Sequence, residues 1–310
     1  MDVAKHDDRA SRRSGVLLVV AAATLWSTGG VGVKIAEAEP LVIAGLRSVF
    51  ALAFMLLVIA VKVRSASGAL LNLLRRPLVW AAAASYALMV VMFVLAARRT
   101  TAANAIFIQY TGPVYVALLS GPLLGEKPRR EDLLTIAGCI VGMMLAFGGE
   151  LGAGRMAGNL LALFSSFGFA ALPLLLRVDQ NKLARRAPDG DVSIAAHAPL
   201  VAISLGNALA ALVALPAIVA HPPAGPGQLK TYAVLFFLGV FQIGLPYVFY
   251  GLAVQRLRAL ETSLIATIEP VLNPIWVLLA TGERPSTLAA AGGVVIIGAV
   301  IMQTLARRAG

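Results

Sequence analysis

The sequence is dominated by a succession of apolar runs, each separated from the next by a few polar or charged residues. An α-helix of about 20 residues is long enough to cross roughly 30 Å of hydrocarbon. Inside a membrane the backbone hydrogen bonds of each run must be satisfied internally, which favours helices. The sequence therefore predicts an all-α integral membrane protein with ten transmembrane helices, at 15–36, 40–61, 77–97, 102–124, 132–149, 157–177, 195–219, 229–254, 259–281 and 286–306.

Composition and charge agree with a membrane protein. Hydrophobic residues make up 59% of the chain and charged residues 13%, which excludes an ordinary soluble domain. A net charge of +11 would suggest nucleic acid as the partner of a soluble protein, but here Lys and Arg gather at the ends of the apolar runs. Nineteen of them fall on one side of the predicted membrane and six on the other. The positive-inside rule then predicts cytoplasmic termini, with residues 1–14 as a cytoplasmic tail.

The connections and the least polar runs carry less information about function. The longest polar connection, 179–194, is predicted to be a cytoplasmic loop, and residues 221–228 are predicted to lie outside. Gly138 and Gly142, four residues apart in the run at 132–149, favour close packing against another helix. The single cysteine, Cys139, excludes an intramolecular disulfide.

A repeated pattern divides the chain into two halves. Pro113 stands thirteen residues before Glu126, and Pro270 stands thirteen residues before Glu283, an offset of 157 residues. The same offset places the sequence GEKP on GERP. Because each unit contains five helices, the second enters the membrane from the opposite side. We therefore predict a five-plus-five inverted repeat, with units at 15–150 and 151–310, an arrangement that suits alternating access around a midplane site.

The run at 259–281 carries the residue that most needs an explanation. Glu269 lies near its middle and is followed by Pro270 and Pro274. A carboxylate at this depth costs about 2.5–3.5 kcal/mol on insertion scales. Each proline also removes a backbone donor and frees a carbonyl of the preceding turn. We expect helix breaks at Pro113, Pro270 and Pro274, next to a cavity that satisfies them.

Arg47, in the second run, leaves two hypotheses open for Glu269. In the first, Arg47 and Glu269 pair and tie two helices together. In the second, Glu269 is unpaired and binds a proton or an amine-bearing substrate. Arg47 itself could cap helix carbonyls, or its planar guanidinium could bind a substrate carboxylate.

Aromatic and polar side chains near the middle of several runs predict a central cavity with an aromatic lining and a few oriented polar groups. Thr262, Glu269 and Asn273 share one helix face, whereas their counterparts in the first half of the chain are small and apolar. This difference predicts that the second half supplies charge to the cavity and the first half supplies space. The alternative is that the polar face contacts another helix. The predicted substrate-binding residues are Trp26, Ser27, Arg47, Tyr86, Phe93, Tyr110, Ser166, Phe169, Gln242, Tyr247, Glu269 and Asn273.

A family resemblance rests on Trp26, Lys34, Pro40 and Arg47, which stand in the pattern LWSTGGVGVK…P…R, and on the doubled proline-then-GE pattern. Over essentially its whole length the chain resembles the ten-helix, EamA-type branch of the drug/metabolite transporter superfamily. The resemblance implies a secondary transporter of small organic metabolites, most simply an exporter of amino acids or related compounds. A multidrug or organic-cation exporter is the alternative. It also implies a bacterial inner (cytoplasmic) membrane, and peripheral helices at 132–149 and 286–306.

Other classes of function lack their usual signs. The sequence has neither G-x-S-x-G nor H-E-x-x-H, and its histidines have no metal-ligand spacing, so we expect no enzyme, no catalytic residue and no metal. It has no phosphate-binding glycine loop, and we expect no cofactor. A channel would need a continuous polar pathway, which the apolar ends of the runs do not supply. We expect a small-molecule substrate and the lipid bilayer as partners, no nucleic acid, and a monomer.

Overall fold

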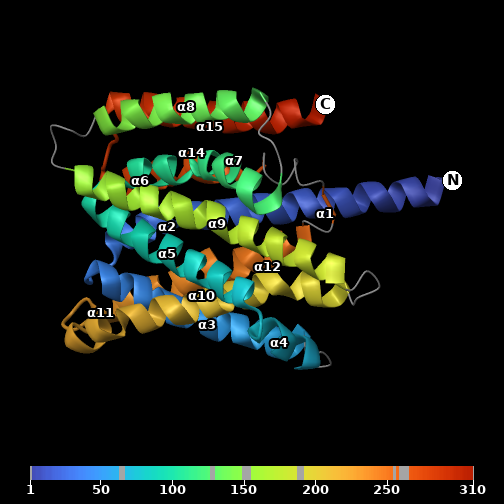
Figure 1. Ribbon diagram of the computed structural model, residues 1–310. Coiled ribbons are helices and arrows are strands. Elements are labelled where there is room, and N and C mark those ends of the chain that lie inside the picture. The colour runs from blue at the N-terminus through green and yellow to red at the C-terminus, as the bar shows by residue number, and fades with distance from the viewer. Residues whose placement is uncertain are drawn as a thin grey trace.

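The computed structural model of the chain describes residues 2–62, 67–125, 130–148, 155–186, 192–253, 256–257 and 265–309. Within these ranges all the regular structure is helical, and no strand occurs (Figure 1). The helices are α1 (Asp2–Ser27), α2 (Gly29–Ile35), α3 (Pro40–Lys62), α4 (Ser67–Leu74), α5 (Pro77–Arg99), α6 (Ala102–Gln109), α7 (Gly112–Leu124), α8 (Arg130–Gly148), α9 (Met156–Arg186), α10 (Val192–Ala220), α11 (Gln228–Phe237), the π-helix η2 (Leu238–Gly244), α12 (Leu245–Ala253), α14 (Ile268–Thr281) and α15 (Thr287–Ala309).

The predicted helical fold is confirmed, and part of the predicted set of spans is supported by length and composition. In the part of the chain that the structure describes, six helical segments are long and apolar enough to cross a membrane: Ser11–Ile35, Pro40–Val61, Pro77–Arg99, Met156–Lys182, His197–Ala220 and Gln228–Ala253. Shorter apolar helices occur at Leu133–Ala146, Ile268–Thr281 and Thr287–Met302. Where the run at 102–124 was predicted, the structure has two short helices, α6 and α7, instead of one.

Helices extend into two segments that were predicted to lie outside the transmembrane runs. The tail predicted at 1–14 belongs to α1, which begins at Asp2, and its side of the membrane stays a prediction. The loop predicted at 179–194 is shorter, since α9 continues to Arg186 and α10 begins at Val192. Residues 180–186 contain no glycine or proline to stop the helix. Asp179 also has a partner, because its carboxylate accepts a hydrogen bond from Arg76 Nη1 at 2.6 Å.

The elements form a bundle in which α8 and α15 lie side by side at one edge (Figure 1). Glycine makes this contact close: a Cβ added to Gly142 of α8 would lie 2.7 Å from the carbonyl oxygen of Gly292 in α15. The start of α1 and the end of α15 lie at the same end of the bundle. The helices at 132–149 and 286–306, expected to be peripheral, are α8 and α15, and their position at the edge of the bundle agrees with that expectation.

Two helix breaks occur at equivalent places in the halves. The first lies at Tyr110 and Thr111, between α6 and α7, and the second at Thr267, before α14. Pro113 and Pro270 then stand in the first turn of α7 and of α14, where a backbone N–H has no intrahelical acceptor and a proline is tolerated. Both prolines therefore lie directly after a break, whereas Pro274 is accommodated inside α14.

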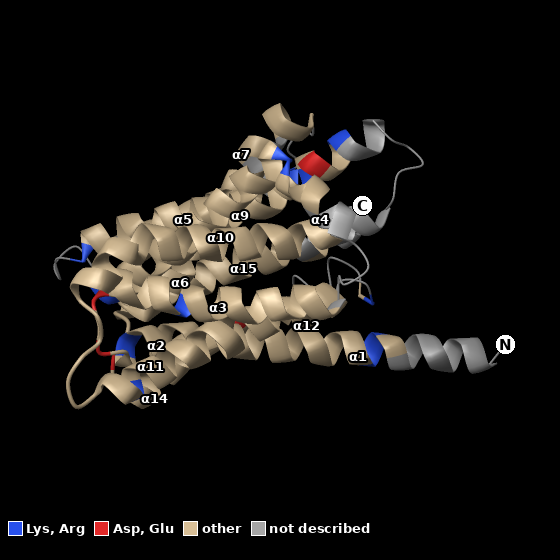
Figure 2. Cartoon of the chain, turned by 90° about the horizontal axis from the view of Figure 1, so that it is seen from below, with Lys and Arg blue, Asp and Glu red and all other residues tan. Residues whose placement is uncertain are grey.

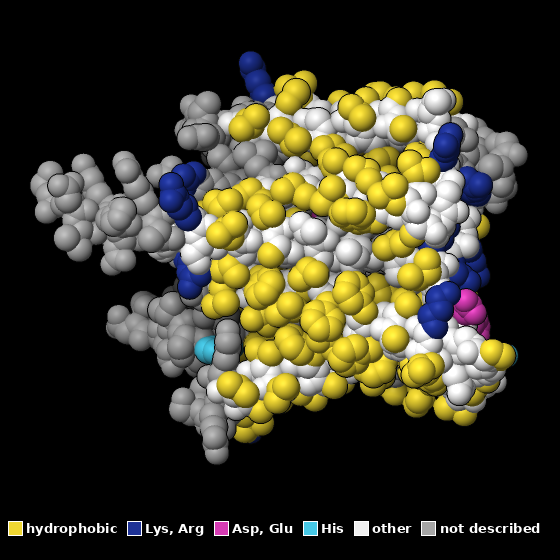
Figure 3. Space-filling model, turned by 180° about the vertical axis from the view of Figure 1, so that it is seen from behind, with side chains coloured by type: hydrophobic (Ala, Val, Ile, Leu, Met, Phe, Trp, Pro, Cys, Tyr) yellow, Lys and Arg dark blue, Asp and Glu magenta, His cyan; other side chains and the backbone are white. Residues whose placement is uncertain are grey.

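The surface carries a broad apolar band. Large hydrophobic side chains such as Leu57, Met144 and Leu279 are more than 60% exposed. Figure 3 shows hydrophobic side chains covering the middle of one face, with Lys and Arg at its two ends. Charged residues likewise gather at the ends of the bundle in Figure 2. Contiguous exposed apolar surface of this extent is typical of a protein in contact with lipid.

Replacing Gly142 with leucine is expected to force α8 away from α15, because the new side chain would meet Ile296 and the Gly292 carbonyl. Overpacking of this kind costs about 1–3 kcal/mol. The apparent melting temperature of the purified protein in detergent should fall by several degrees. Gly298→Leu, on α15, is the matched control, because nothing lies within 4 Å of a Cβ added there. Equal destabilisation by both substitutions would contradict close packing of the two helices.

Candidate functional site

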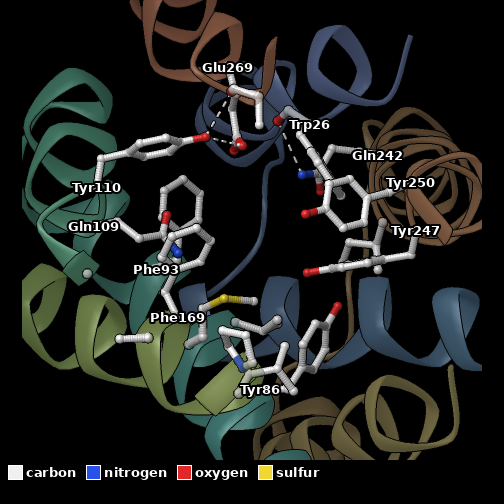
Figure 4. Close-up of a pocket in the computed structure, with 18 of the residues that line it drawn as sticks. Trp26, Tyr86, Phe93, Gln109, Tyr110, Phe169, Gln242, Tyr247, Tyr250 and Glu269 are labelled. Carbon is white, nitrogen blue, oxygen red and sulfur yellow. Dashed lines mark hydrogen bonds between the residues drawn. The ribbon is translucent and has the colours of Figure 1, made fainter. Parts of the chain in front are cut away.

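A cavity of about 400 Å³ lies between the two halves of the chain (Figure 4). It is lined by side chains from α1, α3, α5, α6, α7, α9, η2, α12 and α14. Its volume lies in the range of pockets that hold small organic molecules. Nine of the residues predicted from the sequence line it together: Trp26, Arg47, Tyr86, Phe93, Tyr110, Phe169, Gln242, Tyr247 and Glu269.

The structure places three predicted site residues elsewhere. Ser27 Oγ accepts a hydrogen bond from Trp276 Nε1 at 2.8 Å, and Ser166 Oγ lies 3.0 Å from Thr111 Oγ1. Asn273 is fully buried against Gly30. A mid-helix position indicates depth and not direction, so each of these polar groups packs against a neighbouring helix instead of lining the cavity. Thr262, proposed for the same face as Glu269, lies outside the described residues.

Several lining residues were not among the predicted set. Most are apolar, and an apolar residue in an apolar helix gives no signal in the sequence. Tyr250 and Gln109 are the polar exceptions, and the three-residue spacing of Tyr250 from Tyr247 could have indicated Tyr250. The additional lining residues are Met89, Val90, Gln109, Gly112, Val116, Ala170, Leu172, Pro173, Ile243, Tyr250 and Ala266.

Aromatic rings form two opposing walls of the cavity (Figure 4). On one side Trp26 lies with its ring centroid 5.2 Å from that of Tyr247 and 5.5 Å from that of Tyr250. On the other side the rings of Tyr110 and Phe169 are 5.7 Å apart. The ring of Phe169 can lie close to the backbone of α7 because Gly112 has no side chain. A Cβ added to Gly112 would lie 3.0 Å from Cδ1 of Phe169. The spacings are those of favourable aromatic contacts.

Glu269 projects into the cavity beside the break that precedes α14. Tyr110 Oη donates to Glu269 Oε2 at 2.9 Å and also lies 3.1 Å from the carbonyl oxygen of Ala266. In an unbroken helix that carbonyl would accept from the N–H of residue 270, but Pro270 has none. The Tyr110 hydroxyl therefore lies within hydrogen-bond distance of both the carboxylate and the carbonyl freed by the proline, and it comes from the equivalent break in the other half.

Arg47 and Glu269 take different partners, so the paired hypothesis does not describe this structure. Arg47 is 2% exposed, and its Nη2 donates to the carbonyl oxygen of Val90 at 3.1 Å. Its Nε is buried with no hydrogen-bond partner.

Gln242 stands in the π-helix η2, where the chain changes its hydrogen-bond register before Pro246. Its Nε2 donates to the Trp26 carbonyl oxygen at 3.3 Å, and Gly29 leaves room for the amide. A π-helical turn often marks a functional position, because it redirects side chains that a regular helix would turn away. Here it brings Gln242 into the cavity next to Trp26.

The bundle end opposite the chain termini carries a polar network (Figure 2). Lys34 and Glu283 form a salt bridge, and Lys34 Nζ also donates to the Thr100 carbonyl oxygen at 3.1 Å. Glu283 Oε1 accepts from the Ala102 backbone N–H at 2.8 Å. These contacts join α2, the α5–α6 junction and the α14–α15 connection, and none of the four residues lines the cavity.

Comparison with known proteins assigns the family. The model of the EamA-like transporter family matches residues 13–148 and again residues 156–305. The chain belongs to this family, within the drug/metabolite transporter superfamily, and is a multi-pass membrane protein. A solved structure titled "Crystal structure of protein" has a TM-score of 0.60 at 22% identity, with 96% of this chain and 99% of that one covered, and shows a similar fold. No curated protein matches the chain.

Replacing Trp26 with alanine is expected to change substrate preference more than protein level, because Trp26 lines the cavity and contacts two tyrosines there. We expect relative transport rates across a panel of amino acids and aromatic amines to change several-fold in proteoliposomes. Trp80→Ala is the control, since Trp80 is 43% exposed and does not line the cavity. A parallel loss of expression and of transport for every compound would instead indicate a packing role for Trp26.

Proposed function

We propose that the protein is a secondary transporter that exports small organic metabolites, most simply amino acids or related compounds, by alternating access. The observation that carries the proposal is Glu269, the one carboxylate among the described residues that line an aromatic-rich cavity between two broken helices. Intramembrane carboxylates of this kind typically mark substrate or proton pathways, because they are costly to keep without a function.

The cavity suits a ligand that carries an amine. A carboxylate attracts an ammonium group directly, and the faces of Trp26, Tyr247 and Tyr250 favour a cation near them. The remaining wall is mostly apolar and can bury the rest of a small organic molecule. The organic-cation exporter remains the second candidate, since it would use the same carboxylate and the same rings.

Tyr110 supports proton coupling at Glu269. Its hydroxyl has one hydrogen, which it donates to the carboxylate when Glu269 is ionised. When Glu269 is protonated, the carboxyl can donate to Tyr110 Oη, and Tyr110 can donate to the Ala266 carbonyl. Proton binding would thus change how the two helix breaks are joined. A proton and an amine competing for the same carboxylate would exchange across the membrane without a nucleotide.

Alternating access also needs contacts that separate when the cavity opens. The salt bridge between Lys34 and Glu283 joins segments from both halves of the chain at one end of the bundle. In the proposed cycle this end is closed here and opens when the inverted five-helix units rock against each other. Counterflow of labelled substrate in proteoliposomes would distinguish such a carrier from a channel.

Glu269→Gln is expected to abolish pH-dependent transport while leaving the protein folded, because the amide keeps the shape of the side chain but cannot bind or release a proton. Uptake of a transported amino acid into proteoliposomes, with and without a pH gradient, measures the effect. The control is Glu37→Gln, which removes an exposed carboxylate paired with Lys230 at the bundle end. Retention of a full pH response by Glu269→Gln would disprove proton coupling at this residue.

The proposed orientation in a bacterial inner membrane, with cytoplasmic termini, is tested by labelling. Ala224 is exposed in the connection between α10 and α11, which is proposed to lie outside. Ala224→Cys in a Cys139→Ser background should react with an impermeant maleimide in intact cells. Lys182→Cys, at an exposed position near the end of α9, should react only after permeabilisation. Reversed labelling would overturn the orientation.

A further inference from the structure

We infer that Arg47 is an anion-binding subsite that holds the carboxylate of the substrate, so that the cavity takes zwitterions and discriminates against organic cations. The inference rests on the proposed function, in which this cavity is the transport site. It concerns the end of the cavity that Glu269 does not occupy.

The charge of Arg47 is not compensated within the fold. A guanidinium presents five N–H donors, yet the hydrogen bond observed is from Nη2 to a neutral carbonyl, that of Val90, and Nε is buried without a partner. Buried charges are ordinarily paired, because an unpaired one loses its hydration without replacement. Ion pairs between described residues lie near the helix ends, at Lys34–Glu283, Arg76–Asp179, His221–Glu39 and Lys230–Glu37.

Arg47 also faces the cavity itself. It is one of the lining residues, although it is almost completely buried. Its planar fork matches the two oxygens of a carboxylate, which lysine or an amide would not do as well. A carboxylate bound there would use the donors that the protein leaves free and would neutralise the buried charge.

The positive and negative groups lie apart, across the same space. Arg47 donates to the Val90 carbonyl of α5, one helical turn beyond Tyr86, and Tyr86 and Glu269 lie on opposite sides of the cavity in Figure 4. Tyr247 lies between them in Figure 4, with its ring centroid 5.8 Å from that of Tyr86. A ligand with an amine and a carboxylate can therefore be held at both ends, its amine toward Glu269 and its carboxylate toward Arg47.

This arrangement separates the two candidate substrate classes. An organic cation would satisfy Glu269 but would bring a second positive charge into a low-dielectric cavity that already contains Arg47. A zwitterion compensates both buried charges at once. Specificity of this kind arises as much from repulsion of the wrong ligand as from attraction of the right one.

The test compares three ligands that share one phenyl group: phenylalanine, its decarboxylated form phenethylamine, and its deaminated form 3-phenylpropionate. Binding to the purified protein is measured by titration calorimetry at one pH. We expect phenylalanine to bind at least tenfold more tightly than phenethylamine. In the Arg47→Gln variant this preference should fall to less than twofold while phenethylamine still binds, and Arg47→Lys should restore part of it.

Arg98→Gln is the matched control. Arg98 also donates to backbone carbonyls, those of Val33, Lys34 and Ala36, but it does not line the cavity. Its substitution should leave the ratio of the two affinities unchanged. If Arg47→Gln does not fold, the wild-type comparison of the three ligands decides the question by itself.

The outcomes distinguish this inference from the proposed function. Equal affinity of the wild type for phenylalanine and phenethylamine would overturn the carboxylate subsite and leave the amine site at Glu269 intact. An unchanged preference in a folded Arg47→Gln variant would likewise assign Arg47 to structure alone. Absence of binding by all three compounds would count against both the inference and the proposed amino-acid site.

Discussion

The hydrogen bonds of the Tyr110 hydroxyl hold together the part of the molecule on which the cavity depends. Pro270 frees the Ala266 carbonyl at a depth where water is scarce, and such a group must find a partner inside the protein. Tyr110 reaches both this carbonyl and the Glu269 carboxylate. Because Tyr110 itself stands at the break between α6 and α7, one side chain joins the broken helices of the two halves. Elsewhere, tightly packed helices such as α8 and α15 support this centre.

The two halves contribute different chemistry at equivalent positions. At the offset of 157 residues Glu269 aligns with Gly112, and both residues line the cavity. Gly112 leaves room for the Phe169 ring, whereas Glu269 supplies charge. The same asymmetry holds for Arg47: in this part of the repeat the offset is 159 residues, and the counterpart at that offset, Gly206, lies against Tyr86. A duplicated fold thus provides a symmetric scaffold, and substitution at a few positions makes the cavity polar on selected sides.

Prediction from the sequence succeeded where a residue type has one physical solution in a membrane. A mid-membrane carboxylate needs a cavity or a partner, and Glu269 lines a cavity. Pro113 and Pro270 indicated where two helices break, whereas the break predicted at Pro274 does not occur, because Pro274 lies inside α14. Prediction failed where the side of the helix from which a side chain projects decides its role. Asn273 follows Glu269 by four residues, yet it packs against Gly30 instead of facing the cavity. Ser27 and Ser166 are likewise used by neighbouring helices, and nothing in their local sequence indicates this.

The sequence by itself determined that the chain is helical and apolar, that its halves share a pattern, and that a few charged groups lie deep in it. These properties follow from composition and spacing, which act locally along each segment. The tertiary structure alone decided which partner each charged group takes: Val90 for Arg47, and Tyr110 for Glu269. Those pairings join residues 43 and 159 positions apart. They depend on how the helices rotate and approach one another, which is set by packing across the whole bundle and by no single segment.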